Sequence, residues 1–242
     1  MNRPHGRWGA WCVCRLSAFL LMVGAAVLSA RSAEDTPSAF ERDPSGWTNL
    51  LTGDDPLKHW TRGPIPPEGK LNPKSQWVFD FRTGVLVCQG DRGHEWLRYD
   101  RELGDSVFHV EWRFSPIEGK KGYNSGIYAR NSRDARIWHQ AQTGSGSGGF
   151  LFGDTPVQGK LKRINHGKQG SSRVKPAGEW NTFEITCKGR EMTLWVNGAV
   201  ADQFRECEVK KGYVGLEAEG YRIEFRSVLL KTLGEEKPAP QR

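Results

Sequence analysis

Strict alternation of apolar and polar side chains between residues 107 and 114 is the feature that most limits the fold of this chain. In the sequence Val-Phe-His-Val-Glu-Trp-Arg-Phe, the even-numbered positions are apolar, and the odd-numbered positions from His109 to Arg113 are polar. Successive side chains of a β-strand point to opposite faces, so this period of two predicts a strand with one buried face. A helix would instead need apolar residues three or four positions apart.

The same pattern recurs along the chain and predicts a fold made of sheets. Strands are predicted at 85–89, 107–114, 126–130, 136–141, 182–187, 192–197, 213–218 and 221–230. Asn197-Gly198 suits a two-residue hairpin turn, because both residues tolerate positive φ. Many short strands separated by Gly, Pro and Asn turns are typical of a sandwich or barrel. We predict an all-β sandwich of two antiparallel sheets, whose core contains Phe108, Val110, Trp112, Ile185, Leu194, Val196, Leu216 and Phe225.

Two segments rich in turn-forming residues, 61–75 and 153–178, are predicted as long loops. Loops of that length are uncommon in compact domains unless they are functional. No internal repeat and no second domain are apparent, so residues 34–233 are predicted as one domain. Residues 234–242 are rich in charged residues and Pro and are predicted as a disordered tail.

Residues 1–33 have the three parts of a secretory signal peptide. Arginines precede an uncharged apolar run from Leu16 to Leu28, and Ala30 and Ala33 follow it as small residues for cleavage. The alternative is an uncleaved membrane anchor, but a run this short falls below the roughly twenty apolar residues that span a bilayer. We therefore expect an exported protein, periplasmic or extracellular, with no attachment to a membrane after cleavage.

The exported chain carries too little charge to predict nucleic acid as a partner. The net charge of +7 includes four arginines before residue 34 and no acidic residue there, so the remainder is about +3. Nucleic acids and anionic membranes attract much larger basic patches. Cys88, Cys187 and Cys207 lie in the exported part, and their spacing matches no zinc motif. One disulfide is possible after export, with Cys187–Cys207 favoured.

Short motifs run in a fixed order through nearly the whole exported chain. They are Trp47-Thr48-Asn49-Leu50-Leu51-Thr52-Gly53, His59-Trp60, Gly84-Val85-Leu86, Asn124-Ser125-Gly126-Ile127-Tyr128, Glu179-Trp180-Asn181, Trp195-Val196-Asn197-Gly198 and Gly215-Leu216-Glu217-Ala218-Glu219-Gly220. In this order they resemble the 3-keto-disaccharide hydrolase domain family. The resemblance implies a concanavalin A-like jelly roll and the hydrolysis of 3-keto glycosides.

Three positions depart from the pattern of that family. Relatives place a Glu two residues before a Gln, whereas here Trp138 stands two residues before Gln140. Gly149 occupies a position that is often Asp, and Glu217 one that is usually Gln. The acidic residues are therefore rearranged or partly lost in this chain.

Alternation turns a set of polar and aromatic side chains away from the predicted core. The set contains Glu111, Tyr128, Arg130, Trp138, Gln140, Glu217 and Glu219. If their strands share one sheet, these side chains line one groove. Sugars bind to such mixtures, because aromatic rings pack on CH groups while charged and amide groups hydrogen-bond to hydroxyls. The alternative is that each is an ordinary solvated residue on an exposed sheet face.

Removal of the C2 proton begins the implied hydrolysis of a 3-keto glycoside, because the ketone stabilises the resulting enolate. The glycosidic oxygen then leaves C1, and water completes the reaction. This chemistry requires a general base, a general acid and a group that stabilises the enolate oxygen. Glu111 and Glu219 are predicted for the proton transfers, with His139 and His166 as further candidates. The parity that His139 shares with Ile137 favours the alternative of a buried core histidine.

Six further residues are predicted to hold the substrate, namely Asn124, Tyr128, Arg130, Trp138, Gln140 and Glu217. A conventional glycosidase is the alternative mechanism, since Glu217 and Glu219 would lie roughly 6–7 Å apart along one strand. It is disfavoured, because two carboxylates on one strand do not flank a bond from opposite sides. A non-catalytic sugar-binding module and an interaction module remain open.

The residue pattern predicts a carbohydrate as the partner and no cofactor. No cluster with metal-ligand spacing is apparent, so no metal site is predicted. The sequence does not predict an oligomeric state.

Overall fold

The computed structural model describes residues 35–167 and 173–234. The signal peptide predicted at 1–33 and residues 235–242 of the predicted tail lie outside this part. Among the described residues, no helix has the length and apolar character needed to cross a bilayer.

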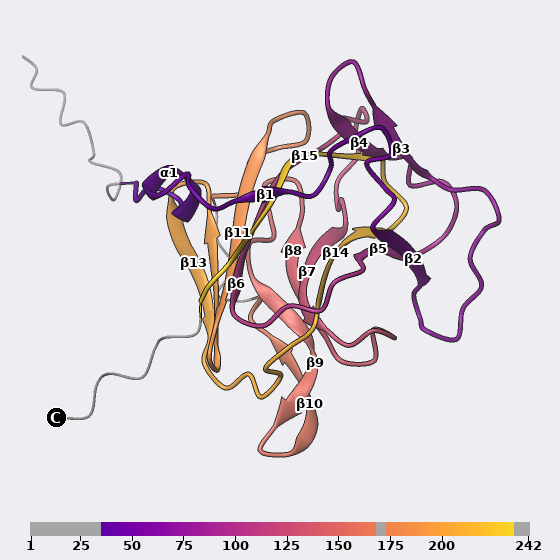
Figure 1. The fold of residues 1–242 in the computed structure, drawn as a ribbon. Coiled ribbons are helices and arrows are strands. Elements are labelled where there is room, and N and C mark those ends of the chain that lie inside the picture. The colour runs from indigo at the N-terminus through magenta and orange to yellow at the C-terminus, as the bar shows by residue number, and fades with distance from the viewer. Residues whose placement is uncertain (1–34, 168–172, 235–242) are drawn as a thin grey trace, which may run out of the picture. The chain divides into compact units, whose positions relative to one another are not determined.

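Two antiparallel sheets make up the described domain (Figure 1). The first sheet contains β1 (Thr48–Asn49), β3 (Trp77–Asp80), β4 (Val85–Cys88), β6 (Ser106–Phe114), β11 (Asn181–Lys188), β12 (Glu191–Val196), β13 (Ala199–Phe204) and β15 (Ile223–Thr232). Its order is β13-β12-β11-β6-β15-β4-β3, and β1 pairs with β15. We call it the β6 sheet.

The second sheet, called the β7 sheet below, carries the site described later. Its strands are β2 (Trp60–Pro64), β5 (Glu95–Tyr99), β7 (Ser125–Asn131), β8 (Trp138–Thr143), β9 (Leu151–Val157), β10 (Lys160–Asn165) and β14 (Tyr213–Ala218). Their order is β10-β9-β8-β7-β14-β5-β2. Strands distant in the chain are therefore neighbours, as β14 lies between β7 and β5.

The predicted sandwich and its core are confirmed. Each of the residues predicted for the core exposes 1% or less of its surface. Trp112 shows how they pack, because its ring lies 5.2 Å from that of Phe183 on the neighbouring strand, edge to face. The predicted turn is also present, since Asn197 and Gly198 have φ of +42° and +104° between β12 and β13.

The prediction of a long loop at 153–178 is wrong for residues 153–165, because β9 and β10 form a hairpin at the edge of the β7 sheet (Figure 1). Along β9, every second residue from Leu151 to Val157 is buried, as alternation requires. The turn consists of Gln158 and Gly159, with φ of +54° and +69°. Gln-Gly is not a common hairpin signal, so the sequence did not indicate this turn.

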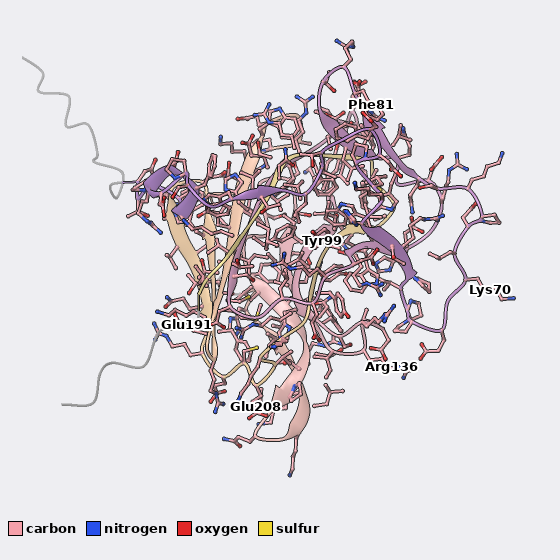
Figure 2. All side chains as sticks on the ribbon, in the orientation of Figure 1. Lys70, Phe81, Tyr99, Arg136, Glu191 and Glu208 are labelled. Atoms are coloured by element: carbon pink, nitrogen blue, oxygen red, sulfur yellow. The ribbon has the colours of Figure 1, made fainter. Side chains whose placement is uncertain are left out.

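The predicted loop at 61–75 is confirmed beyond β2, which ends at Pro64. An ion pair between Glu68 and Arg136, at 2.5 Å, ties this loop to the connection between β7 and β8. Figure 2 shows Lys70 at the outer bend of the loop and Arg136 on the same side of the view. The loop thereby borders the outer face of the β7 sheet.

A short helix, α1 (Ala39–Arg42), packs on the outer face of the β6 sheet. The carboxylate of Glu184 on β11 accepts the backbone N–H groups of Ala39 and Phe40, at 2.5 and 3.0 Å. His109 Nδ1 lies 2.8 Å from the same carboxylate, and the Phe40 ring lies 5.3 Å from the His109 ring. A buried acidic residue thus anchors the N-terminal part of the domain.

The three cysteines of the described part, Cys88, Cys187 and Cys207, are buried free thiols. The Cys187–Cys207 bridge favoured from the sequence is therefore absent there. Burial raises the pKa of Cys88 and of Cys187 to about 12, so both remain protonated parts of the core.

Candidate functional site

A cavity of about 280 Å³ opens on the outer face of the β7 sheet, near the lower end of the range of small-molecule sites. Alternation explains which residues line it. Tyr128, Gln140 and Phe152 face the cavity, while their neighbours Ile127 and Ala141 lie in the core. Residues 65–67, from the loop after β2, complete the wall.

Glu217 is the centre of the polar end of the cavity, and it is only 2% exposed. Tyr128 donates its hydroxyl to Oε1, and His94 Nε2 lies 2.8 Å from the same oxygen. Gln140 donates Nε2 to Oε2 at 2.8 Å. These residues come from β14, β7, β8 and the position before β5, which are neighbours in the sheet. The sheet order therefore assembles a cluster that no local sequence pattern contains.

Gly126 makes room for this arrangement. A Cβ atom at this position would lie 2.2 Å from Nε2 of Gln140, so any other residue would displace the amide from Glu217. The motif Asn124-Ser125-Gly126 therefore has a local physical reason. Ser125 adds to it, because its hydroxyl donates to the backbone oxygen of Glu217 at 2.8 Å.

Glu219 and His94 have shifted proton affinities because they share the cavity with Glu217. Partial burial, followed by the charge of Glu217, raises the pKa of Glu219 above 4.5, although His94 and a hydrogen bond with Asn124 oppose the shift. Burial opposes protonation of His94, but its hydrogen bond to Glu217 and the charges of both glutamates outweigh this, so its pKa lies above 6.5. Burial and Glu217 raise the pKa of Tyr128 well above 10.

Ligand atoms of His94, Glu217 and Glu219 all lie within 4.8 Å of one another, a spacing that a cation could also use. Both oxygens of Glu217 also accept hydrogen bonds, from Tyr128 and from Gln140.

The other end of the cavity is an aromatic wall, formed by Trp138, Phe152, Asp154 and Arg163. The rings of Trp138 and Phe152 lie 4.9 Å apart, edge to face. The Arg163 guanidinium lies 5.4 Å from the Trp138 ring and 5.2 Å from the Phe152 ring. Asp154 accepts hydrogen bonds from Arg163 Nη2 at 2.6 Å and from Trp138 Nε1 at 3.2 Å.

Six of the predicted site residues line this one cavity, namely Asn124, Tyr128, Trp138, Gln140, Glu217 and Glu219. Among its polar and aromatic lining residues, sequence reasoning missed His94, Asn131, Gln142, Phe152, Asp154 and Arg163. The last three lie on the hairpin that was expected to be a loop. His94 precedes β5, a strand that the alternation did not reveal.

The expectation that Glu111 shares a groove with Glu219 is wrong. Glu111 lies on β6, in the other sheet, and points away from the core. There it forms a 2.6 Å ion pair with Arg226, whose guanidinium stacks on Trp180 at 4.0 Å. The alternation correctly predicted that its side chain points outward, but it could not predict which of the two sheets contains its strand.

Arg130 does not reach the cavity either. Its φ is +54°, and the pairing of β7 with β14 shifts register near it, which breaks the alternation that the prediction used. The side chain, 2% exposed, instead donates to Asp105 at 2.8 Å and to the backbone oxygen of Gly189 at 2.7 Å. Arg130 therefore joins the ends of strands and does not line the cavity.

The two candidate histidines also lie outside the cavity. His139 faces the core, with Nε2 2.8 Å from Thr155 Oγ1, and burial lowers its pKa to about 4. This is the core position that its parity favoured. His166 follows β10, and its Nδ1 lies 2.9 Å from Asp202 Oδ1.

Comparison with solved structures shows similarity of fold to carbohydrate-active proteins. A candidate glycosyl hydrolase of Parabacteroides distasonis ATCC 8503 aligns with a TM-score of 0.57 and 16% identity, over 83% of this chain and all of that one. A carbohydrate-binding module, CBM66 from Bacillus subtilis, aligns with a TM-score of 0.52 and 12% identity, over 72% and 96% of the two chains. The β-glucanase of Bacillus licheniformis gives 0.50 and 10%, over 78% and 97%.

A comparison with curated protein sequences finds no match. A family model does match, over residues 40–231, which span almost the whole described part of the chain. The family resemblance expected from the ordered motifs is thus confirmed, together with the jelly-roll type of fold. The chain belongs to the family described as the 3-keto-alpha-glucoside-1,2-lyase-like domain.

Proposed function

We propose that this protein cleaves 3-keto glycosides by removing the C2 proton and expelling the glycosidic oxygen from C1. The observation that carries the proposal is the cluster of His94, Glu217 and Glu219 within 4.8 Å in the cavity of a member of this family. Addition of water to the resulting unsaturated ketone then completes a net hydrolysis.

Glu219 is the general base in this proposal. Its raised pKa makes it a stronger base than an ordinary carboxylate. It takes the C2 proton while the electrons of that bond form the enolate, and it returns the proton to the glycosidic oxygen as the C1–O bond breaks. Because the acid and base steps are successive, one carboxyl group serves both.

His94 stabilises the enolate oxygen. Its raised pKa favours the protonated ring, which offers a charged donor where negative charge develops on the C3 oxygen. Glu217 is a positioning residue for His94, at 2.8 Å from Nε2. Tyr128 and Gln140 hold Glu217 in turn, so the donor is oriented before the substrate binds.

The test is incubation of the protein with methyl 3-keto-glucoside and, in parallel, with methyl glucoside. We expect free methanol, with an ultraviolet-absorbing enone as a transient intermediate, from the ketone only, because only the ketone acidifies the C2 proton. Cleavage of both compounds would overturn the proposal in favour of a conventional glycosidase. Binding of either compound without cleavage would overturn it in favour of a sugar-binding module.

Export is part of the proposed function, because a secretory signal is expected at residues 1–33. The mature chain is expected to start between residues 30 and 36. N-terminal sequencing of the protein recovered from outside the cytoplasm tests this, and a mature form that retains the arginines before Leu16 would contradict it.

A further inference from the structure

The two ends of the cavity differ in chemistry, and this difference indicates what kind of leaving group the substrate carries at C1. At the polar end, amide, imidazole and carboxylate groups from Asn124, Gln140, Gln142, His94 and Glu219 face the space. Such groups suit the hydroxyls and ketone of a sugar ring. This end therefore has the groups needed to hold the oxidised sugar.

At the aromatic wall, ring faces take the place of most polar groups, and the two charged side chains pair with each other. Asp154 accepts from Arg163 and from Trp138 Nε1, so both its oxygens and the indole N–H are occupied. Asn131 also lines the cavity, and its Nδ2 is buried and has no hydrogen-bond partner among the described residues. This wall offers ring faces and few groups for the several hydroxyls of a second sugar.

The wall adjoins the reacting groups directly. Tyr128, which donates to Glu217, lies with its ring 6.4 Å from the Trp138 ring, edge to face. Residues 65–67 of the loop after β2 close the same space with apolar side chains. The wall therefore lies within reach of a group attached to C1 of a sugar held by Glu219 and His94.

From this asymmetry, and resting on the proposed function, we infer that the substrates are 3-keto glycosides whose leaving group is planar and aromatic, with Trp138 as the specificity-determining residue. An aromatic ring packs its whole face on Trp138 and Phe152, whereas a sugar packs only its CH groups there and finds fewer hydroxyl partners than at the polar end. Arg163 adds a cationic guanidinium beside the same surface.

The test compares phenyl with methyl 3-keto-glucoside in the wild type, in Trp138→Leu and in Trp180→Leu. Leucine preserves apolar bulk but removes the flat ring, and Trp180 is the matched control, because it stacks on Arg226 at the outer face of the other sheet. We expect Trp138→Leu to lower the ratio of kcat/KM for phenyl over methyl about three- to tenfold, mainly through KM. Trp180→Leu should leave this ratio unchanged. An unchanged ratio in Trp138→Leu would overturn the inference.

A second measurement separates this inference from the proposed function. Calorimetric titration with the unoxidised phenyl and methyl glucosides requires no turnover. Tighter binding of the phenyl compound to the wild type, lost in Trp138→Leu and retained in Trp180→Leu, would support the aromatic subsite even if no 3-keto compound were cleaved. Tighter binding of a disaccharide than of phenyl glucoside, with the same loss in Trp138→Leu, would overturn it in favour of a second sugar. If Trp138→Leu failed to fold, Phe152→Leu would replace it in both measurements.

Discussion

Glu219 and Glu111 carry the same side chain in two different settings, so one substitution at each position tests the site. Glu219 lines the cavity beside His94, whereas Glu111 pairs with Arg226 on the other sheet. We expect Glu219→Gln to lower kcat for a 3-keto glucoside by about 10²–10⁴-fold, because a positioned base contributes that much. Glu111→Gln should leave kcat within about twofold. Steady-state kinetics with circular dichroism of each variant decides this, and equal losses in both variants would contradict the assignment.

The pH profile should report the two shifted groups. The base must be deprotonated and the donor protonated, so kcat/KM should rise with pH as Glu219 ionises and fall as His94 loses its proton. The rise should be centred above pH 4.5 and the fall above pH 6.5, since both pKa values are raised. Because the groups interact, the two midpoints belong to the pair.

His94→Gln provides the check on that profile, because glutamine keeps a donor but does not titrate. The variant should lose the alkaline fall and keep the acidic rise, at a lower maximum. An alkaline fall that persists unchanged in His94→Gln would exclude His94 as its origin.

For the strands, alternation correctly predicted the direction in which side chains point, but it did not predict to which sheet each strand belongs. Phe108 to Phe114 and Leu216 to Ala218 show the correct inward positions. Glu111 and Glu217 both point outward, but β6 and β14 belong to different sheets, which only long-range pairing decides. The hairpin of β9 and β10 was missed for a local reason, because its Gln-Gly turn resembles no common turn signal. The aromatic wall was missed with it.

The contact between α1 and β11 makes a prediction about stability. Glu184 holds the N–H groups of Ala39 and Phe40 together with His109, so Glu184→Gln should lower the free energy of unfolding at pH 7 by about 1–3 kcal/mol. Urea denaturation measures this. The exposed Glu118→Gln is the control and should change the value by less than about 0.5 kcal/mol.

The same pair of variants has an expected pH dependence. Burial alone would raise the pKa of Glu184, but its bonds with His109, Ala39 and Phe40 outweigh burial and lower it below 4.5. Its contribution to stability is therefore complete above about pH 4.5 and is lost as the pH falls through the lower folded-state pKa. The stability of Glu184→Gln should fall less steeply in that acidic range than that of Glu118→Gln. Parallel curves for the two variants would contradict the role of Glu184.

For the molecule as a whole, the fold class was predictable and the complete site was not. The prediction of the fold rests on an alternation that recurs in several strands, so an error in one segment does not change the predicted sandwich. The site depends on β5, β7, β8 and β14 being neighbours, and on His94, which stands outside any periodic segment. The family motifs identified Asn124, Tyr128 and Glu219 as site residues. Motifs are matched by their order along the chain, so this needs no knowledge of which strands are neighbours in the sheet.

The two sheets share one core, so a defect in one sheet should weaken the other. Leu194 lies on β12 in the β6 sheet, is fully buried, and belongs to the same apolar cluster as Ile127 and Leu216 of the β7 sheet. Leu194→Ala should lower the free energy of unfolding by about 2–5 kcal/mol, through lost burial and the cavity left behind.

Amide hydrogen exchange in Leu194→Ala shows whether the sheets unfold together. Exchange should accelerate by a similar factor in β12 and in β7, β8 and β14, although the substitution touches only the β6 sheet, because opening of either sheet exposes the common core. Val200→Ala is the control on the neighbouring strand β13, where the side chain is 54% exposed, and it should change exchange little in either sheet. Acceleration confined to β11, β12 and β13 in Leu194→Ala would show that the β7 sheet, with its cavity, is stable without its partner.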